Sequence, residues 1–160
     1  MILQFEALNQ EEIGQMYDAI PLITLLIAYA DGEMDDTERS WSEKITEIRG
    51  YSSHETLLDY YEKAGEQFQE KLDSILSSLP EDNEKRLAEI SNRLSGLNTI
   101  FPKLEQVFAW RLYEGLVSYA SHVAKASGGF LGWASISKAE AEVVGLDMIK
   151  PIVLAEEPED

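Results

Sequence analysis

The chain has 160 residues, 44% of them apolar, and carries 30 acidic against 13 basic residues, for a formal net charge of −17. This charge opposes binding to nucleic acids and to anionic membranes, because both depend on lysine and arginine side chains that neutralise phosphate groups. The sequence has no cysteine, which excludes disulfides, thiolate metal sites and cysteine nucleophiles.

The first part of the chain predicts two helices. Asn9 and Glu12 form a capping box that opens a short first helix. Pro21 suits the first turn of a second helix, near residues 19–30, because an N–H group at that position has no partner inside the helix. The second helix is apolar on nearly every side, which is typical of the buried centre of a bundle.

The same apolar run bears on localisation. Residues 19–30 are too few to span a bilayer, and the N-terminus lacks the basic residues of a signal peptide. We therefore expect a soluble, cytoplasmic protein with no direct membrane insertion.

A third helix is predicted near residues 36–49, with Gly50 as its C-terminal cap. Ser52 and Glu55 then form a second capping box, which opens a long fourth helix that continues to Leu79.

A fifth helix carries apolar residues from Leu87 to Phe101. The apolar residues of the fourth and fifth helices recur at alternating steps of three and four, which predicts a long central antiparallel hairpin. A sixth helix is expected near residues 103–126 and a seventh near 138–149. The prediction is an all-α protein: one compact bundle of about seven helices over residues 1–153, followed by an acidic disordered tail, residues 154–160.

One internal repeat is visible between "IAYADGEMDDTERSW" and "VAKASGG…ISKAEAEV". Each copy has a helix that ends in Ala-x-Ala, then a polar residue and glycine, and later a glutamate. In this alignment, Ser127 takes the place of Asp31, and Glu140 that of Glu38; Ser137 stands where the first copy has an aspartate. The repeat predicts two related helix-turn-helix units separated by the hairpin.

The first of these turns holds five carboxylates within eight residues: Asp31, Glu33, Asp35, Asp36 and Glu38. Capping of the next helix by Asp35 and Glu38 explains part of the cluster and leaves Asp31 and Glu33 without a role. A divalent cation such as Ca²⁺, Mg²⁺ or Mn²⁺ would relieve the repulsion, because these ions prefer several oxygen ligands. The spacing is not that of an EF-hand. The candidate metal ligands are Asp31, Glu33, Asp35 and Glu38, and the capping interpretation stays open beside them.

The stretch "AYADGEMDDTE" resembles the signature of the TerB-like (tellurite-resistance TerB) family, and "AKASGGFLGW…ISKAE" resembles a diverged second copy. The resemblance implies a small all-helical module that is not an enzyme and is linked to tellurite and other chemical stress. It also implies divalent-metal binding and protein partners in a membrane-associated complex. It carries Asp31 and Glu38 over as metal or functional residues, whereas Ser127 departs from the family's pattern.

The glycine-rich loop 128–135 contains Phe130, Leu131 and Trp133. These side chains either fold back over the core or form a docking surface for a protein partner. The second possibility defines an alternative function, a metal-free adaptor or structural domain.

Glu114, Ser118 and His122 fall at steps of four and line one helix face. Side chains in such a row do not converge on one point, as a catalytic triad requires. We therefore expect no catalytic residue, and no enzyme activity.

Overall fold

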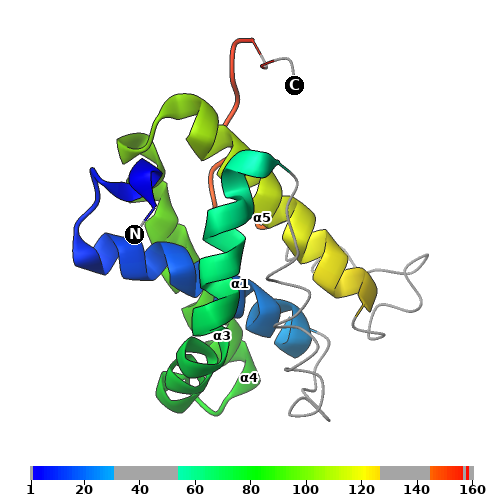
Figure 1. Cartoon of the computed structure of the whole chain (residues 1–160). Coiled ribbons are helices and arrows are strands. Elements are labelled where there is room, and N and C mark those ends of the chain that lie inside the picture. The colour runs from blue at the N-terminus through cyan, green and yellow to red at the C-terminus, as the bar shows by residue number, and fades with distance from the viewer. Residues whose placement is uncertain (1, 31–53, 127–144, 157, 159–160) are drawn as a thin grey trace.

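The computed structural model describes residues 2–30, 54–126, 145–156 and 158. These residues are helical and include no strand, which confirms the all-α class. Four α-helices account for most of them (Figure 1): α1 Gln10–Ala30, α3 Leu58–Ser78, α4 Asn83–Ser95 and α5 Gln106–Ala126. Short 3₁₀ helices flank these: η1 Leu3–Phe5, η2 Glu55–Leu57, η3 Gly96–Thr99 and η4 Phe101–Lys103.

Helix α1 is the centre of the bundle, as its composition predicts. It packs against α3, α4 and α5, and all but one of the side chains from Met16 to Ile27 are buried. Its length corrects one premise of the sequence analysis: at 21 residues, α1 is long and apolar enough to cross a membrane by length and composition alone. A buried core helix passes the same test, and 67% of the apolar window of α1 lies inside the bundle.

The predicted capping box opens α1. The Oδ1 atom of Asn9 accepts a hydrogen bond from the backbone N–H of Glu12 at 2.8 Å, and Oε1 of Glu12 accepts one from the backbone N–H of Asn9 at 3.0 Å. Glu12 also forms an ion pair with Lys103. The bond from the Asn9 backbone, and then that from Lys103, lower the pKa of Glu12.

The division of this region into two helices at Pro21 is wrong, because α1 continues through the proline. An interior proline removes one backbone hydrogen bond and leaves the carbonyl four residues earlier without its usual donor. That carbonyl belongs to Tyr17. The hydroxyl groups of Tyr60 and Thr24 bond instead to the neighbouring carbonyls of Met16, at 2.6 Å, and Ile20, at 2.8 Å. Burial of the whole segment outweighs the roughly 3 kcal/mol that an interior proline costs in helix propensity.

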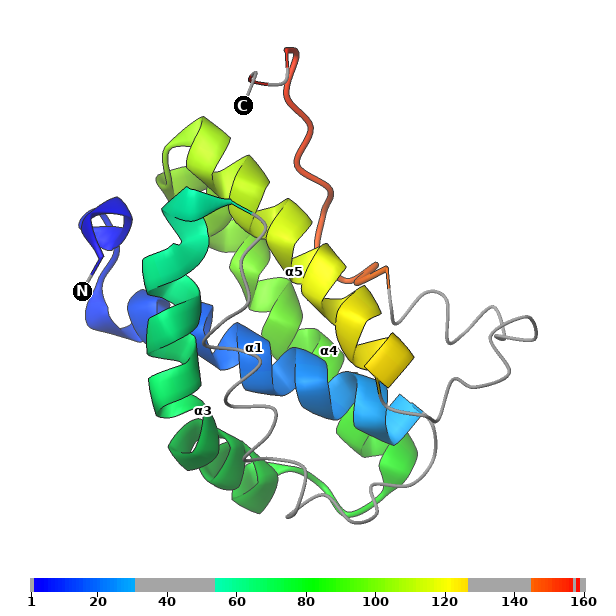
Figure 2. The same ribbon diagram turned by 45° about the vertical axis from the view of Figure 1, so that its right-hand side comes forward.

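The predicted hairpin is also wrong. Both apolar stripes exist, and most of their residues are buried, but α3 and α4 each pack mainly against α1. Figure 2 shows α3 on one side of α1 and α4 on the other. The reason is that α1 is apolar all round and therefore offers a face to each helix.

The expected total of about seven helices does not hold for the part of the chain that is described. The first and second predicted helices are one helix, α1. Residues 145–149, the expected end of the seventh helix, form turns. The fifth ends at Ser95 and continues as the 3₁₀ helices η3 and η4. The helix expected near 36–49 and the first part of that near 138–149 lie outside the described residues, as do the two turns of the predicted repeat.

Candidate functional site

All residues of the predicted metal and partner sites lie in the two segments that the structure does not describe, 31–53 and 127–144. This applies to the metal candidates Asp31, Glu33, Asp35 and Glu38. It applies equally to Phe130, Leu131 and Trp133 of the aromatic loop and to Ser127, Ser137 and Glu140 of the second turn. The structure describes the helices that lead into these segments, namely α1 and α5.

Helices α1 and α5 run side by side in the same direction (Figures 1 and 2). They are joined in the core by Thr24 and Tyr119, whose side-chain oxygens lie 2.9 Å apart. From this point each helix continues for fewer than two turns, α1 to Ala30 and α5 to Ala126. Both Ala-x-Ala ends of the repeat therefore lie at the same end of the bundle.

The C-terminal end of α1 is held by two polar side chains of α4. The Nδ2 atom of Asn83 donates to the carbonyl of Tyr29 at 3.4 Å. The guanidinium carbon of Arg86 lies 3.8 Å from the centroid of the Tyr29 ring, in cation–π contact, and Nη2 of Arg86 donates to Oδ1 of Asn83 at 3.2 Å. These contacts fix the last turn of α1 on α4.

Arg86 also brings a positive charge to the end of α1 that carries the negative pole of the helix dipole. Its Nε atom is buried and has no hydrogen-bond partner among the residues described. The residue that follows Ala30 in the sequence is Asp31, so Arg86 lies close to where the acidic segment begins. Sequence reasoning missed this contact, because Asn83 and Arg86 belong to a different helix and no local pattern connects them with Tyr29.

The other titratable side chains of the described residues offer weaker candidates for a functional site. Within the described ranges, no three histidine, aspartate or glutamate residues are grouped so that they could hold a metal ion. Glu114, Ser118 and His122 lie in a row on the exposed face of α5, as their spacing predicts. Their arrangement along one helix is not that of a catalytic triad.

Beside α1 lies a cluster of buried aromatic rings. Tyr17 of α1 stacks on Tyr60 of α3 with ring centroids 5.3 Å apart, and Phe5 contacts both rings edge to face. Burial, and then the charge of Asp59, raise the pKa of Tyr17 to about 12, and burial raises the pKa of Tyr60. Both tyrosines of the cluster therefore lose their protons at a higher pH than free tyrosine does.

Comparison with protein-family models, with curated proteins and with solved structures finds no match to this chain. The resemblance to the TerB-like family accordingly stays a prediction from the two turn sequences.

Proposed function

We propose that this protein is a non-catalytic, cytoplasmic TerB-like stress-response module whose acidic segment after α1 binds a divalent cation. The proposed ligands are Asp31, Glu33, Asp35 and Glu38, and the proposed ions are Ca²⁺, Mg²⁺ and Mn²⁺. In this proposal, the metal-bound segment presents a surface to a protein partner in a membrane-associated complex. The observation that supports it best is the parallel arrangement of α1 and α5, which end at the same end of the bundle.

This arrangement matters because the two segments that resemble the family follow these two helix ends. The turn residues of both copies then start from neighbouring positions, although they are far apart in the sequence. The contacts of Asn83 and Arg86 with Tyr29 also support the proposal, because they fix the last turn of α1, after which the acidic segment begins. A fixed starting point lowers the entropic cost of bringing several carboxylates around one ion.

The test is a calorimetric titration of chelator-treated protein with Ca²⁺, Mg²⁺, Mn²⁺ and Zn²⁺, combined with thermal unfolding. A cation that binds only the folded state at about 100 times its Kd stabilises that state by about 2.7 kcal/mol. For a domain of this size, the melting temperature should rise by about 5–10 °C. Asp31→Asn should remove most of this rise.

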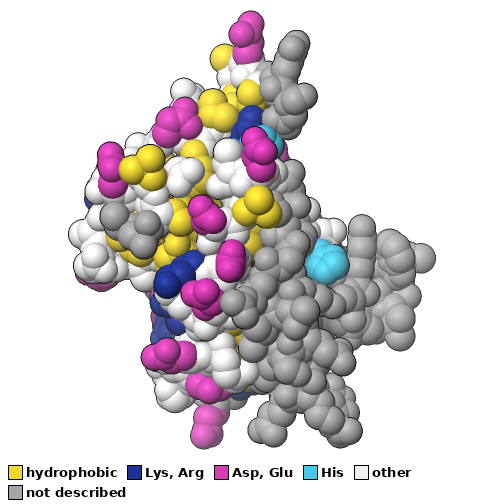
Figure 3. Space-filling view, viewed as in Figure 1, with side chains coloured by type: hydrophobic (Ala, Val, Ile, Leu, Met, Phe, Trp, Pro, Cys, Tyr) yellow, Lys and Arg dark blue, Asp and Glu magenta, His cyan; other side chains and the backbone are white. Residues whose placement is uncertain are grey.

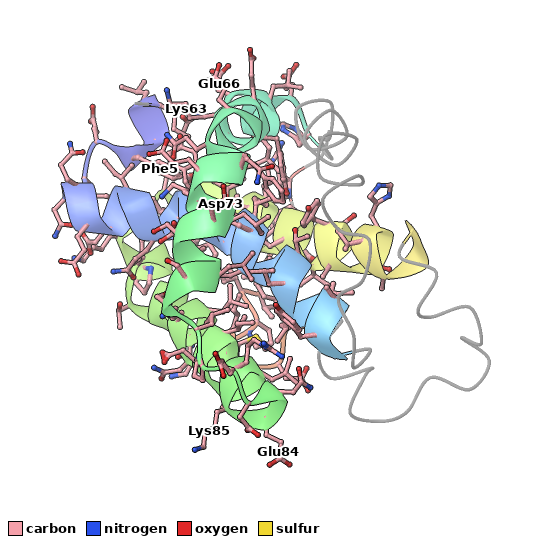
Figure 4. The ribbon with its side chains drawn as sticks, turned by 90° about the horizontal axis from the view of Figure 1, so that it is seen from below. Phe5, Lys63, Glu66, Asp73, Glu84 and Lys85 are labelled. Atoms are coloured by element: carbon pink, nitrogen blue, oxygen red, sulfur yellow. The ribbon has the colours of Figure 1, made fainter. Side chains whose placement is uncertain are left out.

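The matched control is Asp73→Asn, since Asp73 lies on the exposed face of α3 (Figure 4) and, within the described part of the chain, makes only a local hydrogen bond with Gln69. This variant should keep the full response to metal. A melting temperature that ignores all four cations in the unaltered protein would overturn the metal proposal and leave the acidic turn as capping chemistry.

The alternative function is a metal-free adaptor that uses loop 128–135, with Phe130, Leu131 and Trp133 as its contact residues. It is favoured by the position of α5, which leads into this loop at the same end of the bundle as the end of α1. A partner that binds there would therefore approach the acidic segment as well as the aromatic loop.

A further inference from the structure

A cleft of about 520 Å³ lies between the start of α5, the 3₁₀ region before it and the C-terminal segment. Most of its lining is apolar: Phe101, Pro102, Leu104, Ala109, Pro151, Ile152 and Val153. At the rim, Val153 exposes 80% of its surface, and Figure 3 shows hydrophobic side chains at the top of the molecule, where the C-terminal segment leaves the bundle. The size and the composition are those of a small-molecule site.

One wall of the cleft is held in place by Asn98. Its Nδ2 atom donates to the carbonyl of Met148 at 3.0 Å, and its Oδ1 atom accepts from the backbone N–H of Lys150 at 2.8 Å. In the same stretch, the buried side chains of Leu146 and Ile149 anchor the chain in the core. The wall is therefore a fixed part of the fold.

The backbone of Leu146, just before this wall, has a strained conformation. Its φ of 52° is left-handed, a conformation that is unfavourable for a residue with a side chain because the Cβ atom crowds the following carbonyl oxygen. Such strain persists only where the surrounding contacts outweigh it, and it is common beside binding sites.

The polar groups of the cleft indicate the chemistry of its ligand. Both groups of the Asn98 amide are engaged with the backbone, so the polar side chains left in the lining are Gln106 and Lys150. Lys150 is the charged residue of the lining, and within the described ranges its ammonium group has no ion-pair partner. An apolar hollow with one available cation suits a molecule that has an apolar body and one negative charge.

We propose that this cleft binds a small amphiphilic carboxylate, with its hydrocarbon part against Phe101, Leu104 and Ile152 and its carboxylate paired with Lys150. The net charge of −17 repels such an anion at long range. At physiological ionic strength this repulsion is screened over about 8 Å, so the direct contact with Lys150 dominates once the ligand is in the cleft. This site is independent of the metal site proposed above.

The test is an NMR titration of the full chain with sodium octanoate, followed through backbone amide signals and the side-chain amide of Asn98. Octanoate should cause saturable shifts confined to Asn98, Ala109, Lys150, Ile152 and Val153. Octylammonium, which has the same chain length and the opposite charge, should bind at least about tenfold more weakly. Lys150→Met should weaken octanoate binding by about tenfold or more, the loss expected for one charge-assisted hydrogen bond.

Two further variants separate the cleft from the rest of the surface. Lys85→Met is the matched control, because Lys85 is exposed near the start of α4 (Figure 4) and α4 contributes no residue to the lining of the cleft. This variant should bind octanoate like the unaltered protein. Gln106→Trp places a large ring on an exposed position at the mouth and should reduce binding while Lys150 stays in place. The proposal is overturned if the shifts fail to saturate, if they spread over the whole protein, or if Lys150→Met or octylammonium leaves binding unchanged.

Discussion

The side-chain oxygens of Thr24 and Tyr119 lie 2.9 Å apart in the core, although 95 residues separate them in the sequence. The Thr24 hydroxyl already donates its one proton to the carbonyl of Ile20. Tyr119 must therefore donate to Thr24, which gives this contact between α1 and α5 a defined direction. The pair sets the two helices in register at the end of the bundle from which both proposed functional segments depart.

A double-mutant cycle with Thr24→Val and Tyr119→Phe tests this bond. Tyr119→Phe leaves the Thr24 oxygen without its donor, whereas the double variant removes both hydroxyl groups of the pair. We expect a coupling energy of about 1 kcal/mol from urea unfolding, the usual net value of a buried hydrogen bond. The control cycle pairs Thr24→Val with Tyr113→Phe, which lies elsewhere on α5, and should show no coupling. A coupling within error of zero in the first cycle would mean that the bond does not join the helices.

The features that sequence reasoning predicted correctly are local ones. Asn9 and Glu12 are three residues apart, so their mutual bonds follow from the geometry of one helical turn. The apolar stripes of α3, α4 and α5 are equally local, because they follow from steps of three and four residues along one helix.

The failures concern what each element packs against. Pro21 looks like a helix start to a local rule, and its position inside α1 depends on burial by other helices. The predicted hairpin is wrong for the same reason. Helix α1 is apolar all round, so both α3 and α4 pack against it. The contact of Asn83 with Tyr29 joins residues 54 apart, and no periodicity reports it. The cleft beside Lys150 cannot be predicted from local patterns either, because its two walls come from distant parts of the chain.

The capping box should make stability depend on acidic pH through Glu12. Its pKa is lowered from the ordinary 4.5 in the folded protein, so its contribution is fully present above that value and is lost as the pH falls through the folded pKa. Glu12→Gln should therefore be less stable than the unaltered protein at pH 7, and the difference should be smaller at pH 3. Urea unfolding at both pH values measures it. Glu11→Gln, an exposed neighbour in the same turn, is the control; a Glu12→Gln deficit that is equal at pH 7 and pH 3 would contradict the role of the charge.

The tyrosine cluster should make the free energy of unfolding depend on alkaline pH. Here stability should fall as the pH rises, whereas through Glu12 it falls as the pH is lowered. The pKa of Tyr17 is raised from 10 to about 12 in the folded protein, so its contribution is fully present below pH 10 and is lost as the pH rises toward 12. Tyr60 shifts in the same direction and adds to the loss. We expect the free energy of unfolding to fall between pH 9 and pH 11.5, and Tyr17→Phe to make this fall smaller.

The same variant gives a second readout at pH 7. The Tyr17 hydroxyl is buried, and it has no hydrogen-bond partner in the described part of the chain. Removing an unsatisfied buried hydroxyl is neutral or slightly stabilising. Tyr17→Phe should therefore match or exceed the stability of the unaltered protein at pH 7, whereas Tyr119→Phe should not. A loss of more than about 1 kcal/mol in Tyr17→Phe would reveal a partner for this hydroxyl, such as a bound water.

The role of Trp133 distinguishes a loop that packs against the core from a loop that forms the docking surface of the adaptor function. In the predicted repeat, the first copy lacks the extra residues that contain this tryptophan, so the alignment predicts that they are not needed to make the turn. If Trp133 packs against the core, Trp133→Ala should lower the free energy of unfolding by about 3 kcal/mol, and Trp133→Phe should recover part of the loss. If Trp133 belongs to a docking surface, Trp133→Ala should change stability by less than about 0.5 kcal/mol. Urea unfolding of the three proteins, with and without the cation that binds best, decides between them. We expect packing, because most large apolar side chains are buried; a fully stable Trp133→Ala variant would contradict this and favour the adaptor function of loop 128–135.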